Sequence, residues 1–174
     1  MSESRWAVLF DLDQTLILTS ALLPLRQQQR WQEIDAALHL TLLPQGTHQF
    51  LQQMQSVAVL GVVTSSLRSY AEQVLTHHQL PLPVLVAYED TDHHKPSPDP
   101  LLKALAILAI PANRALYVGD AREDMQAATE AGLWSIGLCW DTPLQDLQAA
   151  FPTCSSWDHV LTCISLAMDG HIQP

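Results

Sequence analysis

The stretch VLFDLDQTLI, from Val8 to Ile17, decides how this sequence is read. It is apolar as far as Phe10, and it then places two acidic residues, Asp11 and Asp13, directly after the apolar run. The run itself is typical of a buried strand. Ligands of parallel α/β sheets bind beyond the carboxyl ends of the strands. The two carboxylates therefore stand where a functional site of such a fold is built.

Further apolar runs alternate with helical patterns along the chain. Because these runs are continuous rather than alternating, they predict strands that are covered on both faces of a sheet. Strands alternating with helices predict βαβ units and a parallel sheet. The expected strands are Trp6–Phe10, Val57–Val63, Val84–Ala87, Ala115–Val118 and Ser135–Cys139. The expected helices are Gly46–Gln55, Leu67–His77, Pro98–Ala109, Glu123–Ala131 and Trp157–Met168.

Composition is that of an ordinary globular protein. The 174 residues fit one domain, and 48% of them are hydrophobic. No apolar run approaches the ~20 residues of a membrane-spanning helix, and the first ten residues lack the pattern of a signal peptide. The net charge of −10 argues against partners such as nucleic acids and membranes. Three cysteines without a Cys-x-x-Cys pair favour reduced thiols in a cytoplasmic protein.

Four segments place polar residues just after an expected strand. They are DLDQT at Asp11–Thr15, TSS from Thr64, HHKPSPDP around Lys95, and VGDARED with Asp120 and Asp124. Lys95 is one of only two lysines in the sequence, so it is the leading candidate to bind an anion. Each pattern alone is a weak signal, whereas four in this order are a strong one.

These motifs resemble those of the haloacid dehalogenase (HAD) superfamily of hydrolases, in its phosphatase-like branch. DxDxT, a strand ending in Thr64, Lys95–Pro96 and GDxxxD at Gly119–Asp124 occur in the order of that family. The segments PQGTHQFLQQMQ and AATEAGLWSIGLCW extend the resemblance over most of the chain. The resemblance implies a HAD-like fold, which is a Rossmann-like three-layer α/β/α sandwich with a parallel sheet.

The same resemblance implies phosphate monoester hydrolysis through an aspartyl-phosphate. Asp11 is then expected to be the nucleophile. Asp13 is expected to protonate the leaving alcohol and later to take a proton from water. Thr64, Ser65 and Lys95 are expected to bind the phosphoryl oxygens and to offset the charge that develops on them.

A divalent cation follows from the chemistry as well. A phosphate dianion repels a carboxylate nucleophile, and Mg²⁺ removes that repulsion by joining the oxygens of both groups. Mg²⁺ prefers oxygen ligands and keeps several waters, so a few carboxylates suffice. The ligands that the resemblance implies are Asp11, Asp13 through its backbone carbonyl, Asp120, and Asp124 either directly or through a water.

Simpler structural interpretations stay open for some residues. Asp124 also fits an ordinary acid in the first turn of a helix, and Thr64 also fits a helix N-cap. Other polar and aromatic residues are expected to be surface or packing residues rather than parts of the site; they are His77, His78, His93, His94, Arg68, Trp31 and Trp140.

Little of the chain is left for the cap that covers the active site in this branch. We expect a single domain, residues 1–174, in which residues 19–43 form a vestigial helical cap as one long helix or a helical hairpin. Full caps exclude water and contact the substrate, so the site is expected to be open. The consequences left open are bulky phosphoesters as substrates, a homo-oligomer that covers the site, and a broad, slow phosphatase.

Departures from the family pattern affect substrate contacts and metal binding, so catalysis is expected to be weak. Leu18 and Thr19 replace a more usual acidic or small pair, and Ala121 stands where a hydroxyl residue often follows the metal-binding aspartate. The principal acids are all present. The preferred interpretation is a Mg²⁺-dependent phosphatase that acts on a phosphorylated small molecule. The alternatives are a phosphoprotein or other macromolecular phosphatase, and a non-catalytic binding protein with the HAD fold.

Overall fold

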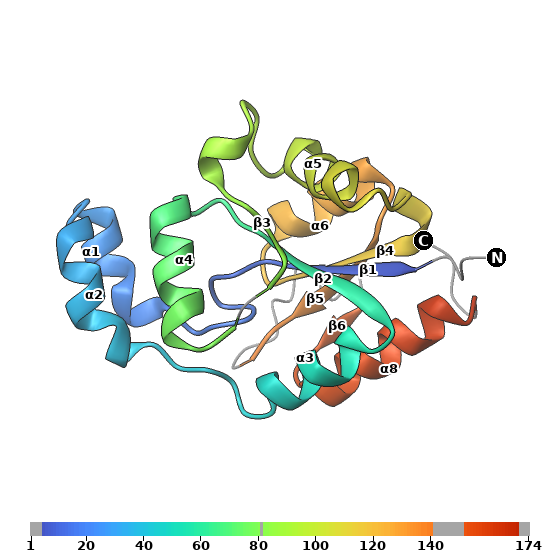
Figure 1. Ribbon diagram of the computed structural model, residues 1–174, viewed down its shortest axis with the longest axis horizontal. Coiled ribbons are helices and arrows are strands. Elements are labelled where there is room, and N and C mark those ends of the chain that lie inside the picture. Colours follow the sequence, from blue (N-terminus) through green and yellow to red (C-terminus); the bar gives the residue numbers. More distant parts are fainter. Residues whose placement is uncertain (1–4, 81, 141–151, 171–174) are drawn as a thin grey trace.

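A parallel sheet of six strands forms the centre of the molecule (Figure 1). The structure is a computed structural model that describes residues 5–80, 82–140 and 152–170. The strand order is β3-β2-β1-β4-β5-β6, and every pairing is parallel. The strands are β1 (Trp6–Phe10), β2 (Ala58–Val63), β3 (Val84–Val86), β4 (Ala115–Gly119), β5 (Trp134–Leu138) and β6 (Thr153–Cys154).

Helices cover both faces of this sheet. Figure 1 shows α5 (Asp99–Leu108) and α6 (Arg122–Ala131) on one face, and α3 (Thr47–Gln55) and α8 (Trp157–Met168) on the other. The fold is therefore the predicted three-layer α/β/α sandwich. Among the described residues, no helix combines the length and the apolarity that crossing a membrane requires.

The predicted elements are confirmed, with small differences at their ends. Each expected strand and helix is present, and Trp157–Met168 begins and ends as predicted. The strand β6 was not predicted, because two residues are too few to give a hydrophobic pattern. Gly132 ends α6 with φ of +74°, a left-handed conformation that suits glycine.

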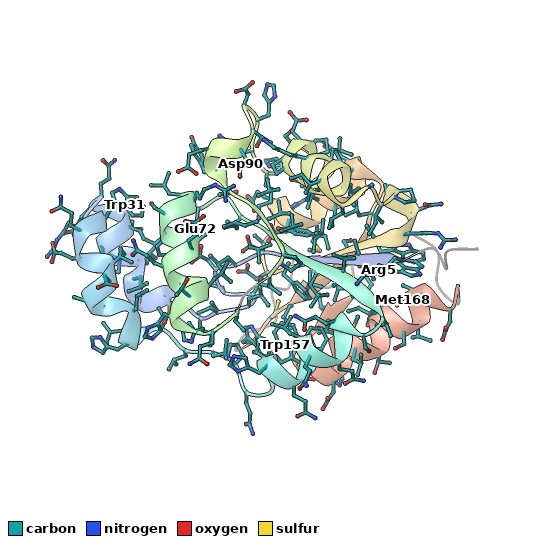
Figure 2. The ribbon with its side chains drawn as sticks, in the orientation of Figure 1. Arg5, Trp31, Glu72, Asp90, Trp157 and Met168 are labelled. Atoms are coloured by element: carbon teal, nitrogen blue, oxygen red, sulfur yellow. The ribbon has the colours of Figure 1, made fainter. Side chains whose placement is uncertain are left out.

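The core has one hydrophobic layer on each face of the sheet. On the side of α3 and α8, the ring of Trp157 stacks on Phe50 with centroids 4.4 Å apart, and its Nε1 donates to Thr47 Oγ1 at 2.8 Å. Figure 2 labels Trp157 at this face. The side of α5 and α6 is packed by smaller residues, including Ala104 and Ala128. These layers hold the strands rigidly, so that the loops after them have a fixed base.

Residues 19–43 form two short helices rather than one long one. They are α1 (Leu23–Gln27) and α2 (Ile34–Ala37), flanked by single 3₁₀ turns. Figure 1 shows both helices beside α4 (Arg68–His77), at the end of the molecule away from the N-terminus. Leu18 and Leu42 close the base of the segment through two backbone hydrogen bonds of 2.8 and 3.0 Å. The segment is thus a folded unit with a defined base.

Its packing against the rest of the protein can be tested with two substitutions. Ile34 is 1% exposed and belongs to the main core, whereas Leu40 in the same segment is 49% exposed. We expect Ile34→Ala to lower the free energy of unfolding by about 2–4 kcal/mol, because it leaves a cavity. Leu40→Ala should change it by less than about 0.5 kcal/mol. Urea unfolding of both variants measures this, and equal effects would contradict the packing described.

Candidate active site

The carboxyl ends of the central strands bring the predicted site residues to one edge of the sheet. Asp11 follows β1 directly, and its N–H donates to the carbonyl of Val118 at 2.8 Å. Thr64 follows β2, and its N–H donates to the carbonyl of Val86 at 2.9 Å. Both residues therefore continue the hydrogen-bond pattern of the sheet, which fixes their backbones. Asp120 follows β4, the neighbour of β1 on its other side.

Lys95 is the centre of this cluster. Its Nζ lies 2.8 Å from Asp11 Oδ1 and 2.6 Å from Asp124 Oδ1, and the side chain is only 6% exposed. The ammonium thus joins the end of β1 to the first turn of α6. Lys95, which the sequence suggested as an anion-binding residue, lies among the acids, and its partners are carboxylates from two different elements.

Tyr117 is a member of the cluster that the sequence did not reveal. It lies in β4 and is fully buried, and its hydroxyl accepts a hydrogen bond from Lys95 Nζ at 2.9 Å. The same hydroxyl donates to the carbonyl of Val63 at 2.7 Å. In the sequence this tyrosine reads as one more apolar residue of a buried strand. It gives Lys95 a third oxygen partner and fixes where the ammonium sits.

Burial and crowding of like charges shape the electrostatics of the cluster. Burial, with the nearby carboxylates of Asp124 and Asp120, raises the pKa of Asp11 well above its ordinary value, although Lys95 opposes this shift. Burial and Asp124 raise the pKa of Asp120 from its ordinary 3.8 to about 6. Burial opposes the charged form of Lys95, but Asp11, Tyr117 and Asp124 together outweigh burial, so the pKa of the ammonium is raised well above its ordinary value. The cluster holds more negative charge than one ammonium offsets.

Three of the carboxylates have the arrangement of a cation site. Asp11, Asp120 and Asp124 each offer an oxygen, and these oxygens lie within 4.8 Å of one another. Thr15 Oγ1 donates to Asp120 Oδ1 at 3.1 Å and orients that carboxylate. A Cβ at Gly119 would lie 2.5 Å from Oδ2 of Asp124, so glycine is needed for the acid to approach β4. Oxygen donors with surplus negative charge suit a hard divalent cation.

The carboxylate of Asp13 makes contacts that are separate from those of Lys95. Its Oδ1 accepts hydrogen bonds from Thr19 Oγ1 at 2.5 Å and from the hydroxyl of Tyr70 at 2.7 Å. Its Oδ2 accepts from Ser66 Oγ at 2.5 Å. Arg26 completes the set with an ion pair of 2.9 Å. The carboxylate of Asp13 is therefore oriented by donors from the 19–43 segment and from α4 and the loop before it.

The polar residues after β2 differ in burial and in the groups that they contact. Thr64 is buried, and its Oγ1 accepts a hydrogen bond from the N–H of Ser66 at 3.1 Å. It does not cap α4, whose N-cap is Leu67. Ser65 is exposed. Ser66, which the sequence analysis did not select, is the serine that contacts Asp13.

One pocket collects these groups. It has a volume of about 290 Å³, and its lining contains each predicted site residue except Asp120. The lining residues are Asp11, Asp13, Arg26, Thr64, Ser65, Ser66, Lys95, Ala121, Glu123 and Asp124. A larger hollow beside α4 and β3 is lined mainly by apolar residues and contains none of these groups. The chemistry of the smaller pocket, rather than its size, makes it the candidate site.

Residues that the sequence analysis left outside the site are engaged elsewhere. Arg68 forms ion pairs with Asp90 and Glu72 and donates to the carbonyl of Leu85. Trp140 is packed near Trp157, and its Nε1 donates to the carbonyl of Thr15 at 3.0 Å. Trp140 thus supports the loop of the first motif from behind.

Most of the chain matches a model of a known protein family. Residues 23–138 match the model described as haloacid dehalogenase-like hydrolase. The chain belongs to this family. The match contains the motifs at Thr64, Lys95 and Gly119–Asp124, while the motif at Asp11–Thr15 lies before it. Membership confirms the resemblance inferred from the order of the four motifs.

Two curated proteins that resemble the chain are named as phosphatases. The validoxylamine A 7'-phosphate phosphatase of Streptomyces hygroscopicus subsp. limoneus is 38% identical over 97 residues, which are 53% of this chain and 45% of that protein. The phosphoglycolate phosphatase of Escherichia coli (strain K12) is 35% identical over 83 residues, which are 47% of this chain and 33% of that protein. The chain thus spans less than half the length of these relatives.

Solved structures confirm the fold. A HAD-superfamily hydrolase of subfamily IA from Geobacter sulfurreducens PCA superposes with a TM-score of 0.76 and 21% identity. The superposition covers 91% of this chain and 99% of that chain. At this identity the likeness supports the arrangement of strands and helices and leaves the substrate open.

The two lysines of the chain give a matched test of the buried ion pairs. Removing Lys95 leaves Asp11 and Asp124 without their cation, so we expect Lys95→Met to cost about 3–5 kcal/mol of unfolding free energy in metal-free buffer. Lys103 is exposed and donates to the carbonyl of Asp90. Lys103→Met should cost less than about 0.5 kcal/mol. Chemical unfolding in EDTA compares them; similar losses would contradict the bridging arrangement.

The pKa of Asp120 predicts how stability depends on pH. Because its pKa rises from 3.8 to about 6 on folding, the folded state holds the proton more tightly. Without metal, stability due to this group therefore falls as the pH rises from about 4 to 6 and stays low above that. We expect Asp120→Asn to be more stable than the native chain by about 1–3 kcal/mol at pH 7.5, with no gain near pH 4.

The control for this experiment is Asp35→Asn, because Asp35 is exposed on α2. Unfolding curves in EDTA at several pH values measure both variants. A gain for Asp120→Asn that is the same at pH 4 and pH 7.5 would refute the electrostatic explanation.

Proposed function

We propose that this protein is a phosphatase that hydrolyses phosphate monoesters of small molecules through an aspartyl-phosphate. The observation that carries the proposal is the contact of Lys95 Nζ with Asp11 Oδ1 beside two further carboxylates, at the carboxyl end of β1. The names of the curated relatives support the reaction, and they differ in the phosphoester that they name.

In the first step, a carboxylate oxygen of Asp11 attacks phosphorus and the bond from phosphorus to the leaving oxygen breaks. Asp13 lines the same pocket and, in its protonated form, gives a proton to that oxygen, so that an alcohol leaves and Asp13 becomes a carboxylate. In the second step, water attacks the aspartyl-phosphate while Asp13 takes a proton from the water. Inorganic phosphate leaves and Asp11 is restored.

Positive charge and hydrogen-bond donors are supplied by fixed groups. Lys95 lies beside Asp11 and can contact an oxygen of the transferred phosphoryl group. Thr64 and Ser65 line the pocket at the end of β2 and add hydroxyl groups to the same wall. Because the sheet holds these residues, little reorganisation is needed when charge develops.

Mg²⁺ fits the carboxylates of this site. Asp11, Asp120 and Asp124 would hold it, with the backbone carbonyl of Asp13 as a further ligand, and their close oxygens and surplus charge support this assignment. When bound, Mg²⁺ would offset the repulsion between the nucleophile and a phosphate dianion.

The 19–43 segment is, in this proposal, the reduced cap of the enzyme, within a single domain of residues 1–174. Its two short helices pack beside α4, and its residue Arg26 lines the pocket. Two helices of four and five residues can shield only part of a substrate, so the pocket stays open to solvent on its remaining side.

The nucleophile is tested with a generic substrate. We expect turnover of p-nitrophenyl phosphate that depends on added Mg²⁺, and a loss of at least about 1,000-fold in Asp11→Asn, because an amide oxygen is a poor nucleophile. Asp35→Asn is the matched control, since it removes an exposed carboxylate. Activity that survives in Asp11→Asn would refute the assignment, and absence of turnover in the native chain would favour a binding protein.

A further inference from the structure

Arg26 reaches from the 19–43 segment into the candidate active site. It lies in α1, and its guanidinium lines the pocket that contains Asp11 and Lys95. Arg30, the other arginine of this segment, pairs instead with the exposed Glu33 at 2.5 Å. One arginine of the segment is thus directed into the pocket and the other is directed to solvent.

Three contacts hold the guanidinium of Arg26 in place. Nη1 lies 2.9 Å from Asp13 Oδ1, and Nη2 donates to Ser66 Oγ at 2.8 Å. The guanidinium carbon also lies 4.6 Å from the centre of the Tyr70 ring, in a cation–π arrangement. The side chain is still 24% exposed. The group is oriented by protein contacts and stays accessible from the pocket.

The charges that line the pocket show what Arg26 adds. Four of the ten lining residues are acidic, and only Lys95 and Arg26 are basic. Lys95 is bound between Asp11 and Asp124, on the side of the nucleophile. Arg26 lies beside Asp13, the residue that contacts the leaving oxygen in the proposed reaction. In the proposed reaction, Lys95 is therefore next to the nucleophile and Arg26 is next to the residue that contacts the leaving oxygen.

We propose that Arg26 is a specificity-determining residue that selects phosphoesters whose leaving group carries a negative charge next to the ester oxygen. This inference rests on the proposed function and names the substrate class of the same site. A guanidinium has five N–H groups in a planar fork that suits carboxylate and phosphate oxygens. Its two protein hydrogen bonds leave capacity for a ligand. Without Arg26, the acidic walls would repel such a leaving group.

Three substrates of similar size separate this inference from simpler ones. 2-Phosphoglycolate carries a carboxylate one carbon from the ester oxygen, and in pyrophosphate, an anhydride with the same kind of scissile P–O bond, the leaving group is itself a phosphate. Ethyl phosphate has a neutral leaving group. We expect the native chain with Mg²⁺ to show a higher kcat/KM for at least one of the anionic substrates than for ethyl phosphate. The two anionic substrates show whether a carboxylate or a phosphate is accepted.

The decisive measurement is the ratio of kcat/KM between the preferred anionic substrate and ethyl phosphate. Arg26→Gln should lower this ratio about 10–100-fold, because a charged hydrogen bond to the leaving group is lost. Arg26→Lys should restore part of the ratio, since it keeps the charge. Arg30→Gln is the matched control and should keep the native ratio. 2-Phosphoglycolate and ethyl phosphate both have an alkoxide as leaving group, so for this pair the effects of Arg26 on Asp13 alter both substrates and cancel in the ratio.

Two results would overturn the inference while leaving the proposed function intact. One is a native ratio at or below one, and the other is a loss in Arg26→Gln that is equal for charged and neutral leaving groups. The second result would make Arg26 a positioning residue for Asp13 alone. If the native chain hydrolysed none of these substrates nor p-nitrophenyl phosphate, the proposed function would fail and the inference with it.

Discussion

The ion pairs of Lys95 with Asp11 and Asp124 join the parts of the molecule on which the site depends. The lysine lies in the loop before α5, while its partners lie after β1 and in the first turn of α6. Buried carboxylates destabilise a protein unless a cation compensates them. A single ammonium therefore fixes how closely these elements approach. Tyr117 limits the position of the ammonium further, because its hydroxyl accepts another hydrogen bond from Nζ.

The sequence predicted the fold well because a parallel sheet repeats one simple pattern. Each central strand is a continuous apolar run, and such runs are recognisable without knowing their neighbours. The carboxyl ends of parallel strands all lie on one edge of the sheet. For this reason Asp11, Thr64 and Asp120 could be placed together from the sequence, although no pairing was known. The structure shows that these residues lie together. Their catalytic and metal-binding roles stay predictions.

The supporting residues could not be predicted, because their contacts depend on geometry beyond the strand pattern. Tyr117 and Tyr70 read as packing residues in a strand and a helix, yet their hydroxyls contact Lys95 and Asp13. Whether Ser65 or Ser66 contacts Asp13 depends on the turn after β2, and no periodic pattern describes a turn. Arg26 depends on how the 19–43 segment docks. Its short helices carry no strong amphipathic signal from which that docking could be derived.

The acidity of the chain makes local cations decisive for any anionic substrate. With a net charge of −10, the long-range field opposes the approach of a phosphate. Attraction must then come from groups within a few ångströms, where low dielectric and fixed geometry strengthen it. Lys95 supplies positive charge on the side of the pocket that contains the nucleophile. The 19–43 segment has only two short helices, so one long side chain is its main contribution to the pocket. Figure 2, with Trp31 labelled close to the helix that carries Glu72, shows how that segment lies against α4. The packing of this segment against α4 holds Arg26 at the pocket, where the proposal places its contact with an anionic leaving group.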